Sequence, residues 1–294
     1  MNVLITGGSG LLARNWALEK KEEFNIFLSV HSRFFEIPGT KKLSLDLGSS
    51  LSLIKAIELN KIDMVIHTAG LTNVEECEKN PKLARLVHVE YSRNIAYVCN
   101  LLKIPLISIS TDHLFKGDKP FLSEDEKVFP QNVYAETKAE AESVVLDICP
   151  DALIVRTNFY GWGPSYRSSF SDWIINSLRK NSTILLFEDV FFTPVNATIL
   201  AKVVHLLAGK KAHGIYHIGS DERISKFDFA IKLAEIFNLN KNLISRCTLS
   251  SRSNLIRRPL DMSLSNLKVK NFLDIEIGMM QDHLFLLREQ ENLG

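Results

Sequence analysis

The chain has 294 residues, of which 46% are hydrophobic and 23% are charged, and its formal net charge is +1 at pH 7. This balance is ordinary for a globular protein and supplies enough apolar residues for one large domain or two modest ones. A net charge this close to zero creates no basic field for nucleic acid and no acidic excess typical of a disordered tail. No apolar run is long enough to span a membrane, and residues 1–10 do not resemble a signal peptide. We therefore expect neither nucleic acid nor a membrane as a partner.

The cysteines show no pattern of their own. Cys77, Cys99, Cys149 and Cys247 lie far apart, without the close spacing of a metal site or a redox motif. Cytosolic proteins keep such thiols reduced, so we expect buried free cysteines, a cytoplasmic location and no metal centre, with disulfides as the alternative.

In the first half of the chain, short apolar runs alternate with helical stretches. Strands are predicted at residues 2–6, 25–30, 41–46, 63–70, 104–111 and 152–157. Helices are predicted at residues 10–21, 51–60, 81–102 and 132–142, the third of them opened by Pro81. Continuous apolar strands separated by helices indicate a parallel sheet covered on both faces. The fold class expected is α/β, with a doubly wound sheet of the Rossmann type.

After Thr157 this rhythm changes. Residues 158–169 resemble a loop, and further elements are predicted as helices at 170–180, 196–209 and 225–237 and a strand at 214–219. Ser225 is suited to cap the last of these helices, and the pattern weakens from residue 241 onward. We expect a Rossmann-type domain over residues 1–157, to which residues 190–219 return, and a smaller lobe over residues 158–294.

The strongest local motif is the stretch LITGGSGLLA, in which a buried strand ends at Thr6 and is followed by Gly7, Gly8 and Gly10. Glycine permits a sharp turn and a close approach to a pyrophosphate, and the helix that begins at Leu11 offers unpaired N–H groups to phosphate charge. We therefore predict a dinucleotide contact by Gly7, Gly10, Leu11 and Leu12. The alternative is a merely structural turn.

The end of the second strand indicates which dinucleotide binds. A site for NAD usually carries an acidic residue there, to hold the ribose hydroxyls. Here His31, Ser32 and Arg33 occupy that place, and the first acid is Glu36. A cation and a hydroxyl suit a 2′-phosphate, so Ser32 and Arg33 favour NADP. Alternatively, Arg33 is a solvated surface residue.

Residues 132–142, NVYAETKAEAE, are rich in helix formers and place Tyr134 four residues before Lys138. Side chains at i and i+4 share one face of a helix, so this pair is either functional or a plain surface pair. Thr111 follows an apolar strand, at the edge where open α/β sheets bind ligands. An ammonium about 4 Å from a phenol, at an effective dielectric constant of ~20, favours the phenolate by up to ~4 kcal/mol. We therefore expect Lys138 to lower the pKa of Tyr134 by about two to three.

A hydroxyl residue followed by this Tyr–Lys pair resembles the short-chain dehydrogenase/reductase superfamily. The spacing Gly7–Gly10–Ala13 is similar to that of its extended branch. In that superfamily the tyrosine is the general acid or base, the lysine tunes it and contacts the nicotinamide ribose, and the Ser or Thr binds the substrate oxygen. The resemblance thus implies that Thr111, Tyr134 and Lys138 are catalytic, and that Tyr134 and Lys138 also contact the cofactor.

Longer stretches resemble the dTDP-4-dehydrorhamnose reductases, from Asn2 to about Lys268. They are HTAGLTNVEECEKNPKLA, STDHLFKG, VYAETKAEAE, RTNFYGWG, FFTPV and RRPLDMSLSNLK. The resemblance implies further cofactor contacts at Asp46, Leu47, Ala69 and Gly70. It implies substrate contacts at Thr72, Thr111, Asp112, His113, Asn158, Phe159, Thr193 and Arg258.

Two histidines depart from the family pattern. His113 stands where the related 4,6-dehydratases carry a glutamate base, which argues against dehydration. His88 stands where family members usually carry an asparagine that organises a proton relay. Alternatively, each histidine is a polar residue near the site whose hydrogen bonds are satisfied by its neighbours. Phe159, Tyr160 and Trp162 either stack on a base or sugar or fill the core.

Together these features predict NADPH-dependent reduction of a nucleotide-linked 4-keto-6-deoxy sugar. One alternative is a regulatory subunit that binds NADP without turnover, like that of methionine adenosyltransferase. Another is a sugar nucleotide epimerase, which Arg33 disfavours because epimerases of this branch usually hold NAD. The sugar, the nucleotide, the stereochemistry and a homodimer are left open by the sequence.

Overall fold

The computed structural model describes residues 1–30, 36–166, 168–252 and 254–292. Its centre is a parallel sheet of seven strands in the order β11-β6-β5-β4-β1-β2-β3. These strands are β1 (Asn2–Thr6), β2 (Asn25–Val30), β3 (Lys41–Ser44), β4 (Met64–His67), β5 (Leu106–Ile109), β6 (Leu153–Thr157) and β11 (Gly214–Ile218). The order reverses between β1 and β4, which opens a crevice at the carboxyl ends of these strands.

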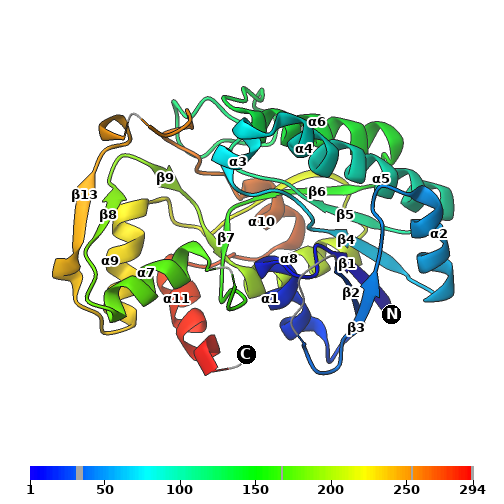
Figure 1. Ribbon diagram of the computed structural model, residues 1–294, viewed down its shortest axis with the longest axis horizontal. Helices are drawn as coiled ribbons and strands as arrows, with labels where there is room; N and C mark the ends of the chain where they lie inside the picture. Colours follow the sequence, from blue (N-terminus) through cyan, green and yellow to red (C-terminus); the bar gives the residue numbers. More distant parts are fainter. Residues whose placement is uncertain (31–35, 167, 253, 293–294) are drawn as a thin grey trace.

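Helices cover both faces of this sheet (Figure 1). One face packs against α1 (Leu11–Lys20), α8 (Ala197–Gly209) and α10 (Leu267–Leu273), and the other against α2 (Ser50–Leu59), α5 (Tyr91–Leu102) and α6 (Val133–Ile148). Successive strand residues point to opposite faces, so Val3 and Ile5 join the first layer whereas Leu4 joins the second. This arrangement confirms the predicted doubly wound α/β fold.

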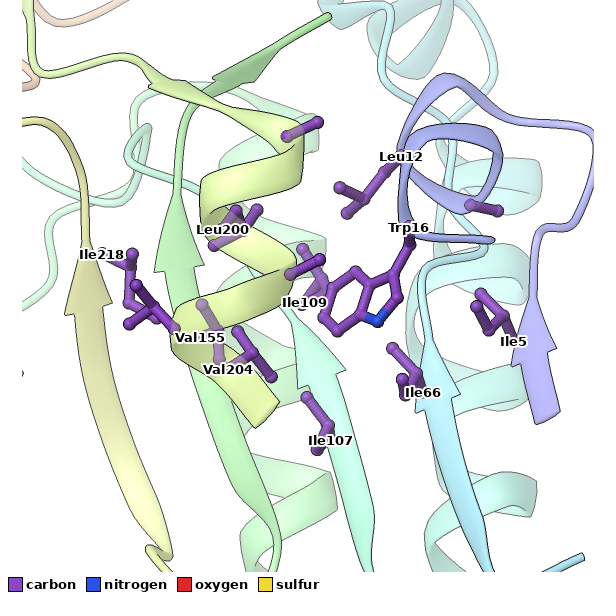
Figure 2. Close-up of a cluster of buried hydrophobic side chains, with 14 of the residues drawn as sticks. Ile5, Leu12, Trp16, Ile66, Ile107, Ile109, Val155, Leu200, Val204 and Ile218 are labelled. Atoms are coloured by element: carbon purple, nitrogen blue, oxygen red, sulfur yellow. The ribbon is translucent and has the colours of Figure 1, made fainter. Parts of the chain in front are cut away.

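Trp16 anchors the helix that follows the glycine-rich turn. Figure 2 shows its indole between the strands that carry Ile66 and Ile109 and the helix that carries Leu200. The ring is fully buried, and its N–H donates a hydrogen bond to His205 Nε2 (3.0 Å). Because α1 is held this firmly, its N-terminus has a defined position at the crevice. Truncation of such an aromatic side chain typically costs ~3–5 kcal/mol.

A second group of elements has its own apolar core beside the carboxyl ends of the strands, on the left of Figure 1. It comprises α7 (Phe170–Arg179), β8 (Ile184–Phe187), β9 (Phe191–Phe192), β12 (Ile224–Ser225), α9 (Lys226–Ile236), β13 (Ile244–Cys247) and α11 (Met280–Glu289). Connecting segments are β7 (Phe159–Tyr160), β10 (Val195–Asn196), η2 (Lys241–Leu243), η3 (Leu249–Ser251) and η4 (Gln290–Asn292). Ser225 caps α9 as expected, because its side chain accepts a hydrogen bond from Asp228 N. The parallel pair β8–β13 was not predicted, since its strands are distant in sequence and neither has a strong local pattern.

The helix predicted over residues 81–102 has an unexpected interruption. After α3 (Val74–Lys79), the chain enters α4 (Pro81–Arg85), then one π-helical turn, η1 (Leu86–Glu90), and then α5. Such turns are rare and frequently lie at functional sites. Here the turn carries His88, which is buried next to α6. No helix in the described parts of the chain is long and apolar enough to cross a membrane.

Candidate active site

A cavity of about 950 Å³ lies at the carboxyl ends of the central strands, against the second group of elements. Most of the residues singled out in the sequence line it. They are Gly7, Gly10, Leu11, Leu12, Ala69, Gly70, Thr72, Thr111, Asp112, His113, Tyr134, Asn158, Phe159 and Arg258. Residues from β1, β4, β5, α6 and the segment after α9 therefore meet at one place, although they are distant in sequence.

The glycine-rich turn is shaped for close approach. Gly7 has a φ of +68°, and a Cβ there would lie 2.8 Å from the backbone of Ala69. A Cβ on Gly8 would lie 2.7 Å from the carbonyl oxygen of Ser29, to which Gly8 N–H donates a hydrogen bond. Leu11 and Leu12, the first residues of α1, line the cavity beyond this turn, and no acidic side chain occupies the first turn of the helix. These features fit the diphosphate of a dinucleotide.

Four residues implied as ligand contacts are not among those that line the cavity, and one of them is Lys138. Asp46 is exposed, and its carboxylate accepts a hydrogen bond from Gly48 N (2.9 Å) in a local turn. Leu47 packs against the layer formed by α2 and α5. Thr193 is buried, and its hydroxyl accepts a hydrogen bond from Leu264 N (3.1 Å), so it stabilises the structure behind the cavity. Ser32 and Arg33 lie outside the described residues.

Tyr134 and Thr111 meet in the cavity. Asn132 caps α6 by accepting a hydrogen bond from Ala135 N (2.9 Å), which places Tyr134 in the first turn of this helix. The hydroxyl of Thr111 lies close enough to the phenol to lower its pKa. Lys138 follows one turn later and donates a hydrogen bond to the carbonyl of Ile109 (2.8 Å), at the end of β5. The helix cap, the strand end and the i, i+4 spacing together arrange these three side chains.

The pKa of Tyr134 differs from the sequence prediction. Burial raises it above the ordinary value of 10.0, and the carboxylate of Asp112 raises it further, whereas the Thr111 hydrogen bond acts in the opposite direction. The predicted lowering by Lys138 is therefore wrong for this geometry. Burial also lowers the pKa of Lys138 itself, to about 8. The phenol is consequently protonated at neutral pH.

Two histidine rings flank Tyr134 edge-on. The ring centroid of His113 lies 5.5 Å from that of Tyr134, and the centroid of His88 lies 5.7 Å from it. Burial lowers the pKa of each histidine to about 3, so both are neutral at pH 7. His88 Nδ1 shares a hydrogen bond with Thr137 Oγ1 (2.8 Å) on α6. His113 Nδ1 is buried and has no hydrogen-bond partner among the described residues.

Other polar side chains that line the cavity include Asp112 and Arg258. Asn158 Nδ2 donates a hydrogen bond to Asp112 Oδ2 (2.8 Å), and burial raises the pKa of this carboxyl. Arg258 forms an ion pair with Glu75 across the mouth of the cavity. Of the three aromatic residues left open, Phe159 lines the cavity, Tyr160 is buried in the second core, and Trp162 packs at its edge.

Sequence reasoning missed two features. Lys226, together with Phe170 and Trp173, forms part of the cavity wall. A lysine in the first turn of an amphipathic helix looks like a solvated residue, so no local signal identifies it. Glu142 forms a buried ion pair with Arg156 (2.7 Å), and the spacing of Tyr134, Lys138 and Glu142 by four residues was the one signal that could have shown their common face.

The seven-stranded parallel sheet, its glycine-rich first turn and the Tyr–Lys pair define an NAD(P)-dependent oxidoreductase of the extended short-chain dehydrogenase/reductase type. Residues 1–290 match the family described as the RmlD substrate binding domain, and the chain belongs to this family. Within the described residues, no group of three or more His, Cys, Asp and Glu side chains is arranged to hold a metal ion.

Three curated relatives illustrate the range of the family. The probable low-salt glycan biosynthesis reductase Agl14 of Haloferax volcanii is 28% identical, over 98% of this chain and 97% of the relative. The methionine adenosyltransferase 2 subunit beta of Xenopus laevis is 29% identical, over 80% of this chain and 72% of its own length. The dTDP-4-dehydrorhamnose reductase of Aggregatibacter actinomycetemcomitans is 26% identical, over 93% and 94%.

Solved structures show the same fold. A dTDP-4-dehydrorhamnose reductase from Clostridium acetobutylicum superposes with a TM-score of 0.86 at 26% identity, covering 98% of this chain and 99% of that one. The enzyme of the same name from Bacillus anthracis, in complex with NADP, superposes with a TM-score of 0.87 at 24% identity, covering 98% and 99%. At the latter identity the likeness concerns the fold alone.

Proposed function

We propose that this protein reduces a nucleotide-linked 4-keto-6-deoxy sugar with NADPH. The observation that carries the proposal is that Thr111 and Tyr134 line the same cavity as the glycine-rich turn. One cavity thus offers a dinucleotide cradle beside a proton donor, which carbonyl reduction requires. The dTDP-4-dehydrorhamnose reductases among the relatives support the choice of substrate class.

Each side chain has a proposed role. Tyr134 donates a proton to the carbonyl oxygen of the substrate, and its raised pKa keeps the phenol in the protonated form that this step needs. Thr111 orients the same oxygen through its hydroxyl. Lys138 contacts the nicotinamide ribose and stabilises negative charge left on the phenol. The bound nicotinamide supplies the hydride.

The remaining predicted contacts hold the ligands. Ala69 and Gly70 pack beside the glycine-rich turn, on the cofactor side of the cavity. Thr72, Asp112, His113, Asn158, Phe159 and Arg258 line the rest of the cavity, where we place the sugar nucleotide. Asp46, Leu47 and Thr193 are not part of this proposal, since their side chains do not reach the cavity.

Turnover is the direct test. The purified protein should oxidise NADPH stoichiometrically when it is given a dTDP-linked 4-keto-6-deoxy hexose, and it should be tested against UDP- and GDP-linked sugars in parallel. The matched control is Tyr134→Phe, which preserves the ring. If NADPH binds tightly and a broad panel yields no turnover, a non-catalytic regulatory role replaces this proposal.

The preference for NADPH has its own test. It rests on Ser32 and Arg33, which stand where an acidic residue would favour NAD. A charge-assisted contact from Arg33 to the 2′-phosphate contributes ~1.5–3 kcal/mol. Titrations should show tighter binding of NADPH than of NADH, and Arg33→Ala should remove most of the difference. Equal affinities in the unmodified protein would contradict the preference.

A further inference from the structure

Lys226 holds an unusual position in the wall of the cavity. It is the first residue of α9, and Ser225 caps this helix immediately before it. Its ammonium lies 3.3 Å from the ring centroid of Phe192 and 4.9 Å from that of Phe170. These two aromatic faces hold the charge in place without neutralising it.

The ammonium lacks a direct partner. Lys226 Nζ makes no hydrogen bond and no ion pair within 4.0 Å to any described residue, although its charge acts on both Asp112 and His113. Arg258, by contrast, lies beside it but is paired with Glu75. Burial lowers the pKa of Lys226, and the Asp112 carboxylate, which raises it, offsets this effect only in part.

The position of this charge limits what it can contact. Asp112 and His113 directly follow Thr111, so Lys226 faces the end of the cavity where the reacting sugar would lie. Asp112 is already held by Asn158 and stands more than an ion-pair distance from Lys226. A ligand lying between them could accept a hydrogen bond from the ammonium and donate one from a hydroxyl to the carboxylate. A sugar that carries an anionic group meets both requirements, because its anion accepts from the ammonium and its hydroxyl donates to the carboxylate.

We propose that Lys226 is a specificity-determining residue that binds an anionic oxygen of the substrate next to the reacting sugar, while Asp112 accepts a sugar hydroxyl. This inference rests on the proposed function for the nature of the ligand. The anionic oxygen belongs to the diphosphate of the nucleotide or, if the substrate is a uronic acid in place of a 6-deoxy sugar, to a carboxylate on the sugar. Both present the same chemistry to an ammonium.

Ligand binding without turnover tests the inference independently of catalysis. Lys226→Met removes the charge and retains a long apolar side chain against Phe192 and Phe170. Lys232→Met is the matched control, because Lys232 lies on the same helix and pairs with Glu222 (2.8 Å). Calorimetric titrations would use thymidine, thymidine diphosphate, UDP-glucose and UDP-glucuronic acid. NADPH titrations would report the integrity of the fold.

Two outcomes support the inference and identify the anion. If the diphosphate is the partner, Lys226→Met should bind thymidine diphosphate about 10- to 100-fold more weakly and thymidine normally. If a sugar carboxylate is the partner, the unmodified protein should prefer UDP-glucuronic acid over UDP-glucose, and Lys226→Met should lose only that preference. Normal binding of all four ligands by Lys226→Met overturns the inference. A protein that binds these ligands but never turns over a sugar would refute the proposed function and leave this subsite intact.

Discussion

At the scale of single residues, Tyr134 is the side chain on which the proposed chemistry depends. Tyr134→Phe removes one oxygen, leaves the ring against His88 and His113, and should lower kcat by ~10²–10⁴-fold. The affinity for NADPH should remain unchanged, as fluorescence titration would show. Near-normal turnover in this variant would assign the proton to another group. His113 is a poor substitute as an acid, since burial lowers its pKa to about 3.

The Lys138 ammonium should lower the free energy of unfolding at neutral pH. Its pKa in the folded protein is about 8 and its ordinary value is 10.5, so protonation at pH 7 opposes folding. The unfolded chain binds more protons between these two values, and stability therefore rises with pH from about 8 to 10.5. Lys138→Met removes the penalty but also the hydrogen bond to Ile109. We expect a net gain of about 2 kcal/mol at pH 7.

Urea denaturation at pH 7 and at pH 10 checks this expectation. The advantage of Lys138→Met over the unmodified protein should shrink at the higher pH, while its catalytic activity is lost at both. Lys232→Met, at a half-buried position where the lysine pairs with Glu222, serves as the control. A variant less stable than the parent at pH 7 would mean that the ammonium is a net stabilising group.

At the scale of one element, α6 presents a functional face. Tyr134, Lys138 and Glu142 follow each other at intervals of four residues, and Glu142 is buried. Its carboxylate pairs with Arg156 on β6 and accepts a hydrogen bond from Ser110, the residue before Thr111. The carboxylate also raises the pKa of Lys138. The helix is thus tied to the two strands that border the cavity.

A double-mutant cycle tests the ion pair between Glu142 and Arg156. Glu142→Met leaves the guanidinium of Arg156 buried without its partner and should cost ~3–5 kcal/mol. Arg156→Met should behave similarly, whereas the double variant should cost much less than the sum of the two, because both charges are then absent. The free energy of unfolding in urea would be measured for the unmodified protein, the two single variants and the double variant. Simple additivity would show that the pair contributes nothing beyond its separate parts.

At the scale of the whole molecule, buried neutral histidines should make the fold sensitive to acid. Burial lowers the pKa of His67, His88, His113 and His217 to about 3 and that of His205 to about 4. Each is protonated in the unfolded chain below its ordinary value of 6.5 but not in the folded protein. The stability present above pH 6.5 is therefore lost as the pH falls toward these lowered values.

The expected slope is steep. Near pH 5 these histidines take up protons on unfolding, whereas Asp112, whose pKa is raised to about 6, releases one, so the net uptake still lowers stability as the pH falls. Urea midpoints measured at pH 7, 6 and 5 should fall accordingly. His213 is exposed and serves as the control position for His→Gln variants. A midpoint that stays constant between pH 7 and 5 would contradict the neutral burial of these rings.

Local patterns predicted much of the fold and part of the candidate site. The alternation of apolar strands and helices indicated the doubly wound sheet, because burial on both faces selects continuous apolar runs. The spacing of Gly7, Gly10 and Ala13 indicated the turn before α1, since sterics at such a turn exclude larger residues. Tyr134 and Lys138 were recognisable because four residues separate neighbours on a helix. Each of these signals lies within one or two elements.

Steric and periodic rules that act over a few residues were enough to identify the fold class, the glycine-rich turn and the Tyr–Lys helix. What surrounds these features depends on how distant segments pack. The His113 ring lies against Tyr134, and β8 pairs with β13. Thr193 lies outside the cavity lining, whereas Lys226 lines the same cavity as Asp112. The tertiary structure also reversed the expected pKa shift of Tyr134. Burial and long-range charge depend on which distant segments pack together, and spacing along the chain carries no record of that packing.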